Sequence, residues 1–190
     1  MNASKSPAGS AYFIVKDTEK PRTHVLSIVV NNEPGALARV IGLFSGRGYN
    51  IESLTVSETS HEKHLSRITI VSSGTAHVLE QIKKLLERSI AVHKVVDQTL
   101  LAEARGFEKP LERELALVKV MGKGENRMEA MRLADAFKAE VIDASTEHFI
   151  FELRGRVSKI EQFIAIMEPL GLVEVCRTGV AAMSRGKAGM

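Results

Sequence analysis

The segment from Asn31 to Leu37, NNEPGAL, contains residue types suited to binding a small charged ligand. A proline at the first position of a helix, beside small residues, leaves backbone N–H groups unpaired at the helix N-terminus. These donors and the helix dipole suit a carboxylate, and Gly35 lets a ligand approach the backbone closely. Asn32 offers a carbonyl oxygen for an ammonium group as well as an amide donor. The segment therefore predicts a site for a zwitterionic amino acid.

The same residues are also favoured in a plain turn between a strand and a helix, so their spacing alone leaves both interpretations open. Asn50 lies at the start of the next predicted strand. A single asparagine at that position is typically a turn residue. In combination with the 31–37 segment, it indicates a second polar group for the same ligand.

Three other groups of residues predict no further chemistry. His61 and His64 lie in a polar hairpin without a third ligand at a familiar spacing, which favours a solvated loop over a metal site. Cys176 lies in an alternating segment and is expected to be a small strand residue rather than a catalytic thiol. The Gly122–Gly124 stretch lacks the spacing of a phosphate-binding loop and predicts a turn. We therefore expect no catalytic residues, no metal ligands and no cofactor in this chain.

The elements that must position the segment alternate between periods of two and of 3.6 residues. The first half predicts the order β-α-β-β-α-β, with strands over residues 24–30, 49–58, 65–72 and 90–99 and helices around 37–44 and 78–86. The second half repeats this order, with strands over residues 115–121, 141–144, 149–153 and 172–180 and helices around 130–137 and 160–167.

This repeat predicts an α+β fold of two ferredoxin-like domains, each an antiparallel sheet with both helices on one face. The predicted organisation is an extension over residues 1–22, a first domain over 23–99, a linker over 100–113, a second domain over 114–184 and a tail over 185–190. Only the first domain contains the Pro34–Gly35 turn, so we expect the effector site there. An apolar sheet face left uncovered in so small a unit favours dimerisation.

Composition excludes several classes of protein. The chain of 190 residues has a hydrophobic fraction of 44%, no tryptophan and a net charge of +3, with basic and acidic residues interleaved. The sequence has no concentrated basic patch of the kind that indicates a nucleic-acid partner. The basic run 185–187 is expected to be solvated tail. No apolar run approaches the ~18 residues of a membrane span, and residues 1–22 lack a signal-peptide core, so we expect a cytoplasmic protein with a flexible extension in which residues 12–15 can dock on another surface.

Residues 23–99, and in particular NNEPGALARVIGLFSGRGYNIESLTV, closely resemble the ACT domain of the acetolactate synthase (acetohydroxyacid synthase) small subunit. The resemblance continues through RELALVKV, EVID and GLVEVCRTGVAAMSRG, so that it spans residues 22–187. Some relatives carry serine in place of Pro34, and the extension lies outside the resemblance.

The resemblance implies a regulatory subunit in branched-chain amino acid biosynthesis. Such subunits bind and activate a catalytic large subunit that uses thiamine diphosphate, Mg²⁺ and FAD, and they mediate feedback inhibition, usually by valine. Their ACT domains pair side by side, and the effector binds at the interface. The implied effector residues are Asn32, Gly35, Ala36 and Leu37 from one chain with Asn50 and Ile51 from its partner, while the second domain is expected to contact the large subunit.

Two other functions compete with this expectation. An ACT-domain regulator that responds to another amino acid would need no enzyme partner. An independent enzyme would need a nucleophile, a metal set or a paired acid and base, and the sequence offers none of these. Which branched-chain amino acid binds best depends on pocket volume.

Overall fold

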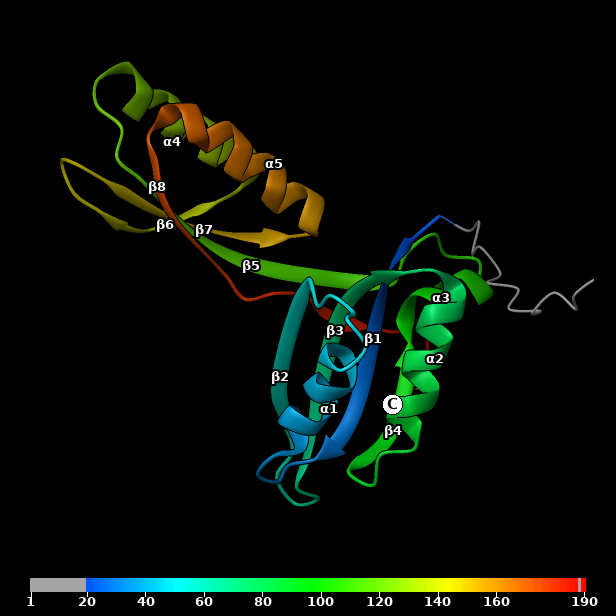
Figure 1. Ribbon diagram of the computed structural model, residues 1–190. Coiled ribbons are helices and arrows are strands. Elements are labelled where there is room, and N and C mark those ends of the chain that lie inside the picture. Colours follow the sequence, from blue (N-terminus) through cyan, green and yellow to red (C-terminus); the bar gives the residue numbers. More distant parts are fainter. Residues whose placement is uncertain (1–19, 188) are drawn as a thin grey trace, which may run out of the picture.

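A computed structural model describes residues 20–187, 189 and 190. Its two halves each contain an antiparallel sheet with helices packed against it (Figure 1). The first half consists of β1 (Arg22–Asn31), α1 (Ala36–Ser45), β2 (Ser53–Ser60), β3 (Leu65–Gly74), α2 (Ala76–Glu87) and β4 (Val92–Asp97). The second half consists of β5 (Leu111–Val120), α4 (Glu125–Phe137), β6 (Glu140–Ala144), β7 (Phe149–Gly155), α5 (Val157–Met167), a short 3-10 helix η1 (Glu168–Leu170) and β8 (Leu172–Arg177).

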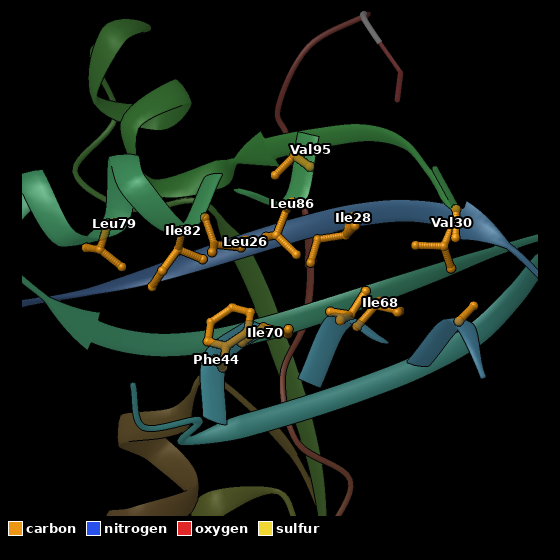
Figure 2. Packing of buried hydrophobic residues seen from close by; sticks show 13 residues of the cluster. Leu26, Ile28, Val30, Phe44, Ile68, Ile70, Leu79, Ile82, Leu86 and Val95 are labelled. Carbon is orange, nitrogen blue, oxygen red and sulfur yellow. The ribbon is translucent and has the colours of Figure 1, made fainter. Parts of the chain in front are cut away.

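The first sheet has the strand order β2-β3-β1-β4, so β2 and β4 form its edges. Alternate side chains of β1 and β3 point towards the helices, because successive residues of a strand face opposite sides. Figure 2 shows Leu26 and Ile28 of β1 with Ile68 of β3 in the resulting core. Phe44 of α1 and the leucine and isoleucine side chains of α2 complete it. This core holds both ends of α1 in place against the sheet.

The second sheet has the strand order β6-β7-β5-β8 and its own core. The Phe163 ring packs there against Phe137 and Phe151, with centroid distances of 5.3 and 6.1 Å respectively. The two halves therefore each bury a separate apolar layer. The prediction of two ferredoxin-like β-α-β-β-α-β domains is confirmed.

The segment between the two sheets contains more structure than a linker. Helix α3 spans Gln98–Ala104, within the region expected to be strand up to residue 99 and linker over 100–113. The Asp97 carboxylate accepts hydrogen bonds from the backbone N–H groups of Thr99 (2.9 Å) and Leu100 (3.0 Å), which is an N-cap. Its second oxygen lies 2.7 Å from Nδ1 of His24, and both side chains are buried. The cap ends β4 two residues earlier than predicted and fixes α3 to β1.

The predicted last strand over 172–180 is also shorter, and the chain after it returns to the first sheet. β8 ends at Arg177, where Gly179 adopts a φ of +79° and redirects the backbone. Strand β9 (Ala181–Met183) then pairs with Leu111–Arg113 at the start of β5. We call residues 178–183 the strap.

The strap covers part of the sheet face that the helices leave open. Val180 and Ala182 are buried against Val25 of β1 and Val71 of β3. The backbone N–H of Val180 donates to Ser53 Oγ at 2.9 Å, and Thr55 Oγ1 donates to the Val180 carbonyl at 2.9 Å. The C-terminal chain is therefore attached to β2, the strand that follows Asn50 and Ile51.

The two ends of the chain complete the comparison with the predictions. The predicted extension over residues 1–22 lies outside the described residues up to position 19, and β1 begins at Arg22. The basic run 185–187 is not wholly solvated, because the Arg185 guanidinium lies 5.0 Å from the centre of the Phe107 ring. No helix in the described part of the chain is long and apolar enough to span a membrane.

Candidate effector site

Gly35 is the N-cap of α1 and has a φ of +82°. This left-handed conformation is strained for residues with a side chain, which explains why glycine stands there. No side chain caps the helix. The first-turn N–H groups of an α-helix have no intrahelical partner, so the backbone after Gly35 presents donors with the positive end of the helix dipole. This geometry suits a carboxylate.

The two asparagines before the turn have different surroundings. The Asn31 side chain accepts a hydrogen bond from His93 of β4. The backbone N–H of Asn32 donates to the His64 carbonyl at 2.7 Å, which fixes its position beside the β1–β3 ladder. Within residues 20–187, the Asn32 side chain is exposed and has no hydrogen-bond partner. Asn32 is therefore the one of the pair that is available to a ligand.

The next two residues of the motif differ in burial: Ala36 belongs to the core, whereas Leu37 is exposed. Ala36 is buried in the core, and its N–H donates to the Glu33 carbonyl at 3.2 Å. Leu37 is 36% exposed on the first turn of α1, whose buried residues are Ala36, Val40 and Phe44. An exposed leucine beside a carboxylate-binding helix end provides an apolar contact for an aliphatic side chain.

Sequence reasoning missed Arg39, which lies one turn further along α1. Its guanidinium forms an ion pair with Glu33, and a Cβ built on Gly35 would lie 3.6 Å from Arg39 Nη1. This places a guanidinium beside the Gly35 turn, where it can donate to a carboxylate, although the Glu33 carboxylate offsets much of its charge. The arginine four residues after the glycine was a usable signal, since that spacing places both on one helix face.

The remaining two predicted residues lie on a different part of the same domain. Asn50 is exposed, and its backbone carbonyl accepts a hydrogen bond from Ser72 Oγ at 2.7 Å, which leaves its side chain unused by this bond. Ile51 is half-buried at the edge of the first core. Both precede β2, which begins at Ser53, so the strand expected from residue 49 starts four residues later.

The structure does not bring the two groups together within one chain. Asn32 is bonded to His64 at one end of β3, and Asn50 is bonded to Ser72 at the other end. At about 3.3 Å per residue, the eight steps along the chain from His64 to Ser72 correspond to about 26 Å. One small ligand cannot contact both asparagines of the same chain.

The edge strand β2 offers a way to join them. β2 begins just after Ile51 and ends at Ser60, which pairs with Leu65 beside the Asn32 end of the sheet. If β2 of one copy pairs antiparallel with β2 of a second copy, the start of each strand meets the end of the other. That two-fold arrangement would bring the Asn50 end of one chain to the Asn32 end of its partner.

The other residues considered at the outset occupy the following positions. His61 lies beside Glu58, with 3.1 Å between Nδ1 and Oε2, in the exposed β2–β3 loop. Cys176 is an exposed strand residue of β8, as predicted, and Gly122–Gly124 form the predicted turn between β5 and α4. Among the described residues, no three His, Cys, Asp or Glu side chains are grouped to hold a metal ion.

An ion pair between a buried glutamate and a partly exposed arginine lies where β5 and β8 meet the first domain. Arg177 donates from Nε (2.8 Å) and Nη2 (2.6 Å) to the two carboxylate oxygens of Glu114, whose side chain is 3% exposed. Hydrogen bonding to Glu114 raises the pKa of Arg177 above its usual value. The pair is bidentate and immediately precedes the strap, so it fixes the direction in which the chain turns back to β2.

Two family descriptions match the chain. Residues 26–94 match the ACT domain of the acetohydroxyacid synthase (AHAS) small-subunit type. Residues 113–186 match the small subunit of acetolactate synthase. The two matches together cover most of both domains.

Individual relatives agree with these matches. The acetolactate synthase small subunit of Mycobacterium leprae is 45% identical over 168 residues, which is 88% of this chain and 95% of that protein. The isozyme 3 small subunit of Escherichia coli is 44% identical over 163 residues, covering 85% and 95%. The crystal structure of the small subunit from Thermotoga maritima aligns with a TM-score of 0.77 at 37% identity, covering 88% and 99%.

Proposed function

Because the chain belongs to the acetolactate synthase small-subunit family, we propose that it binds a branched-chain amino acid between the ACT domains of two copies. We propose valine as the effector. Its carboxylate would bind at the α1 N-terminus after Gly35, and its ammonium group would bind the Asn32 carbonyl oxygen and the Asn50 side chain of the partner chain. Leu37 and Ile51 would contact the aliphatic side chain.

One observation carries this proposal: the two halves of the motif are bonded to opposite ends of β3, between which the strand rises by about 26 Å. A site that uses both must be completed by a second chain. An effector shared between two chains stabilises one dimer arrangement over others, and this is how a small molecule can act on a distant active site. We propose that the dimer passes this effect to a catalytic large subunit, which supplies the thiamine diphosphate, Mg²⁺ and FAD of the reaction and is activated by this chain.

Mixing two inactive variants tests the shared site directly. Asn32→Ala and Asn50→Ala each remove one half, so neither homodimer has an intact site and neither binds valine in calorimetry. Dissociating and reassociating an equal mixture creates dimers in which one site has both wild-type halves. Random pairing then restores about one quarter of the wild-type valine capacity.

The matched control is a mixture of Asn32→Ala with Asn32→Ala/Asn50→Ala, in which no site can have two intact halves. This control is expected to remain inactive. If the informative mixture also recovered no valine binding while size measurements showed mixed dimers, the shared site would be wrong. If either single variant kept wild-type affinity, the assigned residue would not be part of the site.

A further inference from the structure

An open groove of about 480 Å³ lies on the sheet face opposite α1 and α2, beside the strap. One wall is formed by the outward-facing residues of β2 and β3, which include Ser57, Arg67 and Thr69. The other wall is the β5–β9 ladder, in which Leu111 pairs with Met183 and Arg113 pairs with Ala181. Neither the effector residues nor the helix cores line this groove. It therefore requires a separate explanation.

The groove is positively charged and has no acid of its own. It is lined by two arginines, Arg67 and Arg113, and none of its lining residues is acidic. By contrast, the neighbouring cavity on the other side of the strap is lined by five glutamates together with Arg22 and Lys109. The two sides of the strap therefore differ in charge, since only the first groove has basic residues without acidic ones. An anionic group is favoured in the first groove.

Both arginines lack a carboxylate partner among the described residues. The Nε atom of Arg67 is buried without a hydrogen-bond partner, and its side chain forms no ion pair. Arg113 donates from Nη1 to the neighbouring Glu112 carbonyl at 2.7 Å and to no carboxylate. Arg177, a short distance along the same strand ladder, has a bidentate partner in Glu114. A buried guanidinium nitrogen that is left unpaired is costly, so the groove favours a partner that supplies the missing acceptor.

The rim of the groove has the composition of a protein interface. Leu111 is 36% exposed and its ladder partner Met183 is 57% exposed, so both leave apolar surface in water. Arginine and methionine are enriched in interfaces, and arginine is frequent among residues that dominate binding. The groove is open rather than enclosed, whereas sites for small molecules bury most of their ligand. A polypeptide segment fits these features better than a free metabolite.

We propose that this groove is the docking surface for a segment of the catalytic large subunit that places an acidic side chain, flanked by apolar ones, against Arg67 and Arg113. The inference rests on the proposed function, because it requires a large-subunit partner. It extends the expected contact beyond the second domain, since the groove is built from both domains. A partner seated there contacts β2, which follows the effector residues Asn50 and Ile51, and the strap that leads to the second domain.

The test measures the affinity of the full-length chain for its purified large subunit by biolayer interferometry, over a series of salt concentrations. Arg67→Gln and Arg113→Gln are each expected to weaken binding by at least about tenfold and to make it less dependent on salt. Arg88→Gln is the matched control, because Arg88 is an exposed arginine at the C-terminal end of α2, on the face of the first sheet opposite the groove. It is expected to bind as the wild type does. Valine binding by each variant checks that the ACT domain remains folded.

The possible outcomes separate the two proposals. If the wild-type chain does not bind the large subunit, the proposed function fails together with this inference. If the wild type binds and both groove variants bind equally well, only the docking surface is overturned. It is also overturned if the variants change only self-association in sedimentation experiments, which would identify a second copy as the occupant. It is likewise overturned if the variants lose affinity for a free carboxylate but still bind the large subunit as the wild type does, which would identify a metabolite site.

Discussion

Gly35 combines two physical requirements in one residue. Its φ of +82° suits glycine, and a Cβ at this position would meet only Arg39 Nη1, at 3.6 Å. A side chain at position 35 therefore meets no steric clash at its Cβ, so a substitution can change the charge at the helix end. Asparagine and aspartate tolerate the left-handed conformation better than other side chains do. This makes them a matched pair for a test of charge.

We predict that Gly35→Asp abolishes valine binding, because the introduced carboxylate occupies the position that the effector carboxylate needs. Gly35→Asn has nearly the same size and the same backbone strain but no charge, so it is expected to bind valine more tightly than Gly35→Asp. Isothermal titration calorimetry measures both affinities. Equal affinities of the two variants would contradict the assignment of the carboxylate to the α1 N-terminus.

At the residue scale, the sequence indicated backbone geometry better than side-chain contacts. Pro34 and Gly35 predict a helix start because their conformational preferences are local, but the expected proline at the first helical position was wrong, since Gly35 is the N-cap and the helix begins at Ala36. Side-chain contacts depend instead on how distant elements pack. The hydrogen bond from His93 to Asn31 forms because β4 lies beside β1. The Arg39 side chain lies near Gly35 because it is held there by its own contacts. The sequence and the resemblance already favour Asn32, and the structure adds the physical reason: Asn31 is bonded to His93, whereas the Asn32 side chain is exposed.

The strap acts at the scale of elements, because it joins the second domain to β2. Gly179 has a φ of +79°, and a Cβ there would lie 2.7 Å from Ser53 Oγ and 3.2 Å from Thr55 Cγ2. We predict that Gly179→Ala lowers the free energy of unfolding by about 1–3 kcal/mol, since it adds both backbone strain and a clash. Urea denaturation followed by circular dichroism measures this change.

Gly189→Ala provides the control within the same C-terminal region. Gly189 has no positive φ, and a Cβ there meets no atom within 4 Å, so its stability is expected to match that of the wild type. If Gly179→Ala also left the denaturation midpoint unchanged, the strap would not be held in the tight position described for it.

Periodicity predicted the elements of both sheets, since burial on one side imposes a period of two or 3.6. It missed α3 and β9, and both misses occur where a single residue redirects the chain. The Asp97 carboxylate caps the N-terminus of α3. Gly179, with its positive φ, turns the backbone away from the direction of β8. The alternation of apolar and polar residues continues past Asp97 and past Arg177 in the sequence. The strands predicted from it, over residues 90–99 and 172–180, therefore extend beyond the observed ends of β4 and β8. The three-residue strand Ala181–Met183 could not be predicted from local pattern, because it forms only by pairing with Leu111–Arg113, which is distant along the chain.

At the scale of the whole molecule, an effector held by two chains must stabilise the dimer that holds it. A ligand that binds only the assembled state shifts assembly by mass action, by about 2.7 kcal/mol for each site at a hundred-fold excess over its Kd. We therefore predict that valine at this excess lowers the dimer dissociation constant by about 100-fold for each site, and so by about 10,000-fold when both sites of the dimer are filled. Sedimentation velocity over a dilution series, with and without valine, measures the change.

Gly35→Asp is the control for this effect, because it is expected to dimerise without responding to valine. Linkage is reciprocal, so the apparent affinity for valine must also rise with protein concentration until the dimer is fully formed. A dimer dissociation constant that stayed the same in saturating valine, while calorimetry still detected binding, would indicate a site within one chain. The 26 Å separation of Asn32 and Asn50 along β3 argues for the first outcome, since only the dimer can bring these two side chains to one ligand.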